Sequence, residues 1–227
     1  MEYILDTANL DDIKYMNEYF PISGVTTNPS IIAKEKTDFF GLVGAIRGII
    51  GEEKMLHIQT TQKKAEGIVA EAEVLAKRVG GKLYLKIPVC DEGLKAASML
   101  KKHGDLGVGV TMTAIFTPQQ ALISAMAGAD YVAPYVNRLD SISADGVGVV
   151  ADIVALFQNF GTGCKVLAAS FKNVQQINDV ALVGCHSVTA SAELLKAAIT
   201  HPMTDRAVQG FDADWQKVYG NDTILSF

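Results

Sequence analysis

One lysine lies in an apolar segment where a charged side chain is costly. Lys86 occupies the middle of LYLKIPV, residues 83–89, a run typical of a buried strand. Desolvation lowers the pKa of such a lysine, so that a neutral amine can attack a carbonyl group and form a Schiff base. The other interpretation is an ammonium group that reaches solvent at a strand end or pairs with a carboxylate. The strand alone leaves both open.

Two further segments near the N-terminus carry polar groups in positions where they could bind a substrate. Asp6 follows the apolar pair Ile4-Leu5 and could orient a hydroxyl group or exchange a proton. It could also cap the following helix, although Asn9 suits that purpose too. Thr26 and Asn28 stand in TTNPS, residues 26–30, where helix capping and ligand binding are both open.

Polar residues recur at the ends of several other β-rich runs. The complete set of such residues is Asp6, Thr26, Thr27, Asn28, Gln59, Lys86, Thr113, Tyr135, Asn137, Arg138, Ser170 and Lys172. Three of them, Arg138, Ser170 and Lys172, end the sixth and seventh runs, near the region where barrel enzymes often hold a phosphate group. Arginine offers bidentate geometry for that anion; the alternative is that Arg138 is simply exposed and Lys172 is an ordinary surface lysine.

The elements that must position these residues alternate between strands and helices along the whole chain. Strands are predicted at residues 3–7, 24–27, 55–60, 83–89, 108–114, 131–136, 166–170 and 187–189. Amphipathic helices are predicted at residues 62–79, 91–103, 118–127, 145–158, 173–183 and 192–199. Such alternation indicates a parallel sheet, and eight repeats predict one α/β domain over residues 1–227, a (β/α)8 TIM barrel. An additional C-terminal helix is expected over residues 204–220, packing on its own barrel or on a neighbouring subunit.

Composition and charge exclude several classes of function. The net charge of −5 and the lack of basic runs argue against nucleic acid and against an anionic membrane as partners. No apolar run is long enough for a membrane span, and no secretory signal is expected. The chain has three widely separated cysteines with no C-x-x-C pair: Cys90, Cys164 and Cys185. This pattern favours reduced thiols in the cytoplasm. The sequence has no glycine-rich motif for a dinucleotide or nucleotide, so no cofactor is expected. Its histidines are not spaced as metal ligands, so no metal is expected.

Several stretches together resemble the small transaldolase family, in order and over essentially the whole chain. They are LDTA (residues 5–8), GVTTNPS (24–30), LKIP (85–88), YVAPYVNR (131–138), AASFK (168–172) and the pair Asp214-Trp215. Within the family, the sequence is more similar to the fructose-6-phosphate aldolase type than to true transaldolases. The reason is that Gln59 and Tyr135 replace the glutamate and phenylalanine usual in transaldolases.

The resemblance implies a role for each matching residue. Lys86 would be the Schiff-base nucleophile, and Tyr135 the acid/base group, acting through a water held by Gln59 and Thr113. The hydroxyls of a dihydroxyacetone unit would be bound by Asp6 and Asn28, with Thr26 beside them. The phosphate of the aldehyde half would be bound by Arg138, Ser170 and Lys172. Many transaldolases carry arginine at the position of Lys172. A lysine keeps the positive charge but lacks the bidentate hydrogen-bonding geometry of a guanidinium group.

The implied activity is that of a class I aldolase that forms or cleaves fructose 6-phosphate from dihydroxyacetone and glyceraldehyde 3-phosphate. The alternative is a transaldolase that moves a dihydroxyacetone unit between sugar phosphates in the pentose phosphate pathway. A barrel that binds sugar phosphates without catalysis is a further alternative. The resemblance also implies a homodecamer of two pentameric rings, with the C-terminal helix reaching a neighbour. Partners would otherwise be small ketones, aldehydes and sugar phosphates.

Overall fold

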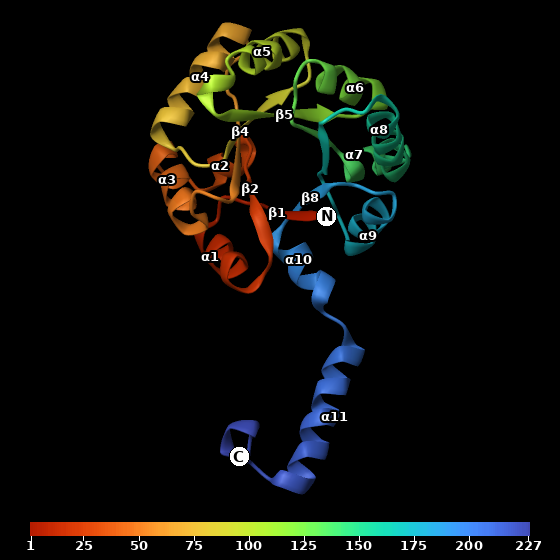
Figure 1. The fold of residues 1–227 in the computed structure, drawn as a ribbon. Helices are drawn as coiled ribbons and strands as arrows, with labels where there is room; N and C mark the ends of the chain where they lie inside the picture. The colour runs from red at the N-terminus through yellow and green to blue at the C-terminus, as the bar shows by residue number, and fades with distance from the viewer.

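Eight parallel strands close into a barrel in sequence order, and β8 pairs with β1 to complete it (Figure 1). The computed structural model describes residues 1–227 apart from the side chain of Asp105. The strands are β1 (Glu2–Asp6), β2 (Ile22–Thr26), β3 (Met55–Gln59), β4 (Leu83–Pro88), β5 (Val108–Ile115), β6 (Tyr131–Pro134), β7 (Lys165–Ala168) and β8 (Ser187–Ala190). Each predicted strand overlaps one of these, so the predicted (β/α)8 barrel is confirmed.

Helices surround the barrel and cover the outward faces of its strands (Figure 1). They are α1 (Leu10–Tyr19), α2 (Pro29–Lys34), α3 (Phe39–Ile50), α4 (Ala65–Arg78), α5 (Asp91–Lys102), α6 (Pro118–Met126), α7 (Val136–Asp140), α8 (Gly146–Phe160), α9 (Val174–Leu182), α10 (Ala192–Ile199) and α11 (Pro202–Tyr219), with short 3-10 turns at Gly104–Leu106 and Ile224–Ser226. The predicted helices agree with these to within a few residues. Helices α1, α2, α3 and α7 lie outside the helical ranges predicted.

The core has two parts, as the alternation of side chains along each strand requires. Outward-facing residues such as Leu5, Val25 and Leu85 pack under the helices in one large apolar cluster. A smaller cluster consists of Ile4, Met55, Tyr131 and Leu167. Further along the strands the buried side chains include polar ones: Thr26, His57, Lys86, Thr111, Thr113 and Thr189. The fold therefore gathers polar groups toward the carboxyl ends of the strands, where barrel enzymes have their active sites.

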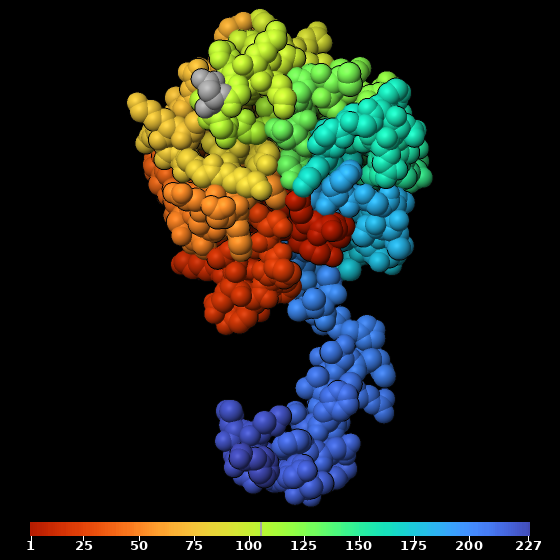
Figure 2. Space-filling model, viewed as in Figure 1, coloured from red at the N-terminus to blue at the C-terminus, as the bar shows by residue number. Residues whose placement is uncertain are grey.

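Helix α11 stands away from the barrel in both the ribbon and the space-filling picture (Figures 1 and 2). It begins at Pro202, two residues before the predicted start, because proline suits the first helical position and His201 supplies the cap. None of its residues is buried, and Phe211 is 72% exposed. Within the part of the chain that the structure describes, no helix has both the length and the apolar character needed to cross a membrane.

Candidate active site at the carboxyl ends of the strands

Lys86 lies on β4 with only 4% of its surface exposed. Its Nζ donates a hydrogen bond to the backbone carbonyl of Thr27 at 3.1 Å. Among the described side chains, no carboxylate comes within ion-pair distance of this amine. The side chain therefore neither reaches solvent nor pairs with an acid. Burial lowers the pKa of Lys86, and the charge of Asp6 opposes that shift, so the amine loses its proton more readily than a lysine in water.

Asp6 ends β1 and accepts a hydrogen bond at 2.7 Å from the hydroxyl of Thr26, its register partner on β2. The same hydroxyl lies 2.6 Å from that of Thr189 on β8. Helix α1 is capped by Asn9, whose side chain accepts from the backbone N–H groups of Asp11 and Asp12. Asp6 is therefore not the helix cap, and its carboxylate lies instead within a chain of hydroxyl groups at the mouth of the barrel.

Asn28 caps helix α2, as one of the two interpretations of its motif expects. Its side-chain oxygen accepts a hydrogen bond from the backbone N–H of Ile31 at 3.0 Å, and Pro29 follows at the first helical position. The cap uses only the oxygen of the amide. Because Asn28 follows Thr27, whose carbonyl holds Lys86, the cap also fixes a segment that touches the lysine. Capping and ligand binding are therefore compatible at this residue.

Tyr135 and Thr113 come together from two neighbouring strands. Their hydroxyl groups lie 3.1 Å apart, and the rings of Phe116 and Tyr135 pack edge to face at a centroid distance of 5.5 Å. The predicted sixth strand, residues 131–136, is too long. It ends at Pro134, and Tyr135 is the N-cap of the short helix α7. The turn still keeps one bridge to Ala169, so Tyr135 stays at the barrel mouth.

Gln59 is the last residue of β3 and stands opposite Lys86 in the strand register. The next residue, Thr60, donates its backbone N–H to the carbonyl of Lys86 at 2.9 Å. The side chain of Gln59 is partly exposed. A backbone hydrogen bond therefore joins the ends of β3 and β4 where Gln59 and Lys86 lie.

The three residues predicted to bind phosphate follow β6 and β7. Arg138, an exposed residue, has its guanidinium carbon 4.8 Å from the centre of the Tyr135 ring. Ser170 has a φ of 63°, in the left-handed region, and its carbonyl accepts from the N–H of Asn137 at 2.7 Å. This bond brings Ser170 next to the Arg138 segment. Lys172 is exposed, and its backbone N–H is held by Gln176 at 2.7 Å.

Sequence reasoning missed a buried polar pair. His57 is fully buried, its Nδ1 lies 2.9 Å from the hydroxyl of Thr111, and its ring stacks on Tyr84 at a centroid distance of 4.6 Å. Burial lowers the pKa of His57 well below its ordinary value, and the charge of Lys86 lowers it further. The available signal was position: His57 is two residues before Gln59 and so shares its side of β3. No set of three His, Cys, Asp or Glu side chains in the described residues is placed to hold a metal ion.

Comparisons with known proteins agree with this architecture. The chain matches the transaldolase/fructose-6-phosphate aldolase family over residues 3–222. Among solved structures, thiamine phosphate pyrophosphorylase from Pyrococcus furiosus aligns with a TM-score of 0.59 and 12% identity, over 84% of each chain. A mandelate oxidase variant with an FMN adduct aligns with a TM-score of 0.55 and 11% identity, over 81% of this chain and 59% of the other. At such low identity, these two structures show a shared barrel fold alone.

Proposed function

We propose that this chain, which belongs to the transaldolase/fructose-6-phosphate aldolase family, is a Schiff-base aldolase that cleaves or forms fructose 6-phosphate. The products of cleavage would be dihydroxyacetone and glyceraldehyde 3-phosphate. The observation that carries the proposal is the environment of Lys86, a buried amine held by a backbone carbonyl. The neutral amine is the form of lysine that attacks a ketone, and desolvation favours that form.

The reaction we propose begins with attack of the Lys86 amine on the keto carbon of fructose 6-phosphate. Loss of water gives an imine that withdraws electrons from the neighbouring carbon–carbon bond. Removal of the proton from the C4 hydroxyl then breaks the C3–C4 bond, which releases glyceraldehyde 3-phosphate and leaves an enamine. Protonation at C3 and hydrolysis of the imine release dihydroxyacetone and regenerate the amine. The water lost in the first step is consumed in the last.

Tyr135 is the acid/base group in this scheme, acting through a water held by Gln59 and Thr113. The 3.1 Å contact between the Thr113 and Tyr135 hydroxyls supports this assignment, since a general acid must be within hydrogen-bond reach of its relay. Gln59 carries no ionisable proton, so the tyrosine hydroxyl is the titratable member of the group. In a transaldolase, a glutamate would take that part.

The remaining predicted residues would bind the two ends of the substrate. Asp6, with Thr26 hydrogen-bonded to it, and the free amide nitrogen of Asn28 would receive the hydroxyls of the dihydroxyacetone half. Arg138, Ser170 and Lys172 would receive the phosphate group. The closeness of the Arg138 guanidinium to the Tyr135 ring supports a short distance between the phosphate subsite and the acid/base group.

The assembly we propose is a homodecamer of two pentameric rings in which α11 packs on a neighbouring subunit. Its support is that α11 exposes large apolar side chains, including Phe211 at 72% and Val218 at 71%. An unpartnered apolar stripe of this kind is unusual on a soluble monomer.

The experiment that decides between aldolase and transaldolase is a single assay of glyceraldehyde 3-phosphate release. The aldolase proposal expects release from fructose 6-phosphate alone. Release that depends on added erythrose 4-phosphate would instead identify a transaldolase. No release under either condition, together with no covalent trapping by borohydride, would leave a barrel that binds sugar phosphates without catalysis.

A further inference from the structure

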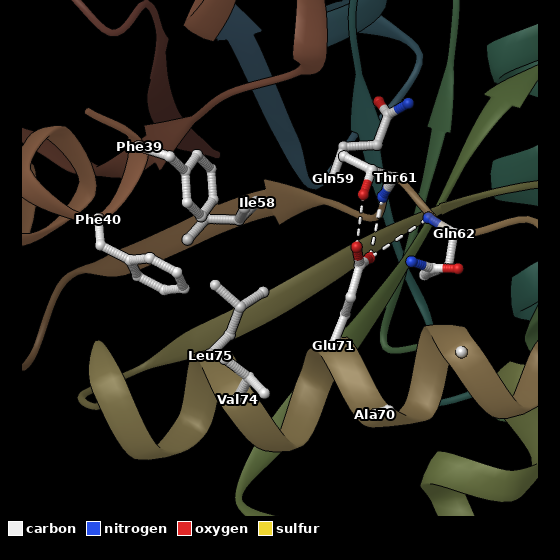
Figure 3. Close-up of a pocket in the computed structure, with 11 residues that line it drawn as sticks. Phe39, Phe40, Ile58, Gln59, Thr61, Gln62, Ala70, Glu71, Val74 and Leu75 are labelled. Atoms are coloured by element: carbon white, nitrogen blue, oxygen red, sulfur yellow. Dashed lines mark hydrogen bonds between the residues drawn. The ribbon is translucent and has the colours of Figure 1, made fainter. Parts of the chain in front are cut away.

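The carboxylate of Glu71, on helix α4, accepts hydrogen bonds from the loop that connects β3 to α4. The hydroxyls of Thr60 and Thr61 both donate to it. The backbone N–H groups of Thr61 and Gln62 donate as well, at 2.9 Å and 3.4 Å. In Figure 3 the carboxylate points from the helix toward Thr61 and Gln62, with the amide group of Gln59 beyond them. One side chain therefore gathers three successive residues of the loop.

This loop begins directly after Gln59 and is anchored to the strand that carries Lys86. Thr60, the first loop residue, is 5% exposed. Its backbone N–H donates to the carbonyl of Lys86, while its hydroxyl donates to Glu71. Thr60 is thus fixed from both sides. Gln59, the residue before it, is the last residue of β3.

A groove separates part of the loop from the helix. Its volume is about 560 Å³, and its lining is mainly apolar. The side chains on the groove side of Glu71 in Figure 3 are Phe39, Phe40, Ile58, Val74 and Leu75. Because an open groove borders the loop on that side, the hydrogen bonds that Thr60, Thr61 and Gln62 donate to Glu71 are its attachment to helix α4.

The hydrogen bonds of the Glu71 carboxylate all come from this loop. Burial raises its pKa, but the hydrogen bonds from Thr60, Thr61 and Gln62 outweigh that effect and leave the pKa below its ordinary value. Among the described residues, no lysine or arginine forms an ion pair with Glu71. A partly buried carboxylate without a cation is costly unless hydrogen bonds satisfy it, and here the loop provides all of them. Glu73, on the same helix, is exposed to solvent.

We propose that Glu71 is a positioning residue for the reaction at Lys86, because it fixes the end of β3 and with it the side chain of Gln59. This inference rests on the proposed aldolase function. It makes Gln59 the residue through which Glu71 acts. Removal of Glu71 would therefore slow turnover without preventing the imine from forming.

The test is a double-mutant cycle on fructose 6-phosphate cleavage. Glu71→Ala should lower kcat by between about tenfold and 100-fold, the scale expected when a catalytic group is misplaced by roughly 1 Å. In a Gln59→Ala background, the same substitution should cost less than about twofold, because the two changes act through one group. Glu71→Gln should recover part of the rate, since its amide oxygen still accepts from the Thr61 N–H. Glu73→Ala is the matched control and should leave kcat unchanged.

Each outcome of this cycle either supports the inference or overturns it. An equal loss of kcat in both backgrounds would show that Glu71 merely stabilises the fold, as would a parallel loss in borohydride trapping at Lys86. An unchanged kcat for Glu71→Ala would also overturn it. If Glu71→Ala fails to fold, Thr61→Val gives the same test with one donor removed, with a loss of kcat that disappears in the Gln59→Ala background. A wild-type protein that neither cleaves nor traps substrate would contradict the proposed function itself.

Discussion

The hydroxyl groups of Thr113 and Tyr135 lie 3.1 Å apart, one near the end of β5 and the other just after β6. This contact places a titratable phenol next to a hydroxyl that can hold a water molecule. The neighbouring Phe116 ring and the Arg138 guanidinium border the tyrosine on other sides. The arrangement is what the proposed acid/base role of Tyr135 requires, without a carboxylate.

Tyr135→Phe separates proton transfer from imine formation. Without the hydroxyl, kcat for fructose 6-phosphate cleavage should fall by roughly 100-fold or more, the usual scale of general acid–base catalysis. Borohydride trapping at Lys86 should persist, because the nucleophilicity of the amine does not depend on the phenol. Thr113→Val is a useful companion and should show the same pattern more weakly. A near wild-type rate for Tyr135→Phe would assign the acid/base role to Asp6, and a joint fall in trapping and turnover would place Tyr135 in imine formation.

Adding Gln59→Glu to the Tyr135→Phe chain restores the pair of residues typical of transaldolases. The new carboxylate should recover part of the transfer of a dihydroxyacetone unit to erythrose 4-phosphate. The measurement is the formation of sedoheptulose 7-phosphate in the double variant and in Tyr135→Phe alone. Equal rates in the two would show that these positions do not decide between aldolase and transaldolase chemistry.

The pH dependence of imine formation reports on the environment of Lys86. Burial lowers the pKa of its amine from the ordinary 10.5, while the charge of Asp6 acts in the opposite direction. Only the neutral amine attacks, so the rate of trapping with dihydroxyacetone should rise with pH to a plateau whose midpoint lies below 10.5. Asp6→Asn removes the opposing charge and should move the midpoint to lower pH. A midpoint that stays in place or rises would show that Asp6 does not act on Lys86.

Substitutions at Asn28 distinguish helix capping from substrate binding. Asn28→Asp keeps the oxygen that caps α2 and loses only the amide N–H groups, so thermal stability should be retained while KM for fructose 6-phosphate rises. Asn28→Ala loses both functions and should also destabilise the fold by roughly 1 kcal/mol, the usual cost of a lost cap. Equal KM values for wild type and Asn28→Asp would restrict this residue to capping.

Removal of residues 204–227 should break the proposed assembly into smaller species, as measured by sedimentation velocity. The reason is the exposed apolar surface of α11, to which Phe211 and Trp215 belong. A full-length chain with both residues changed to aspartate should behave in the same way, because the two lie one turn apart on the helix. If the truncated chain sediments as the same assembly, α11 is not part of the subunit contacts.

The barrel could be predicted from the sequence because strict alternation of strand and helix patterns leaves few other folds. The end of β6 could not, since a five-residue helix such as α7 leaves too short a pattern to recognise. The pairs Thr26–Thr189 and His57–Thr111 join residues that are 163 and 54 positions apart, and only the closed barrel brings them together. The contact of Glu71 with the loop after β3 could not be predicted either, because an acidic residue within a helix ordinarily indicates a solvent-exposed face.

The attachment site of the substrate tests the account most directly. Borohydride reduction of the protein with dihydroxyacetone, followed by peptide mass analysis, should find the added mass on Lys86 alone. Lys86→Met matches the length and apolar character of the side-chain stem, so this variant should remain folded and show neither labelling nor cleavage. Attachment at Lys82, Lys165 or Lys172, or continued labelling of Lys86→Met, would contradict the assignment of Lys86 as the Schiff-base residue.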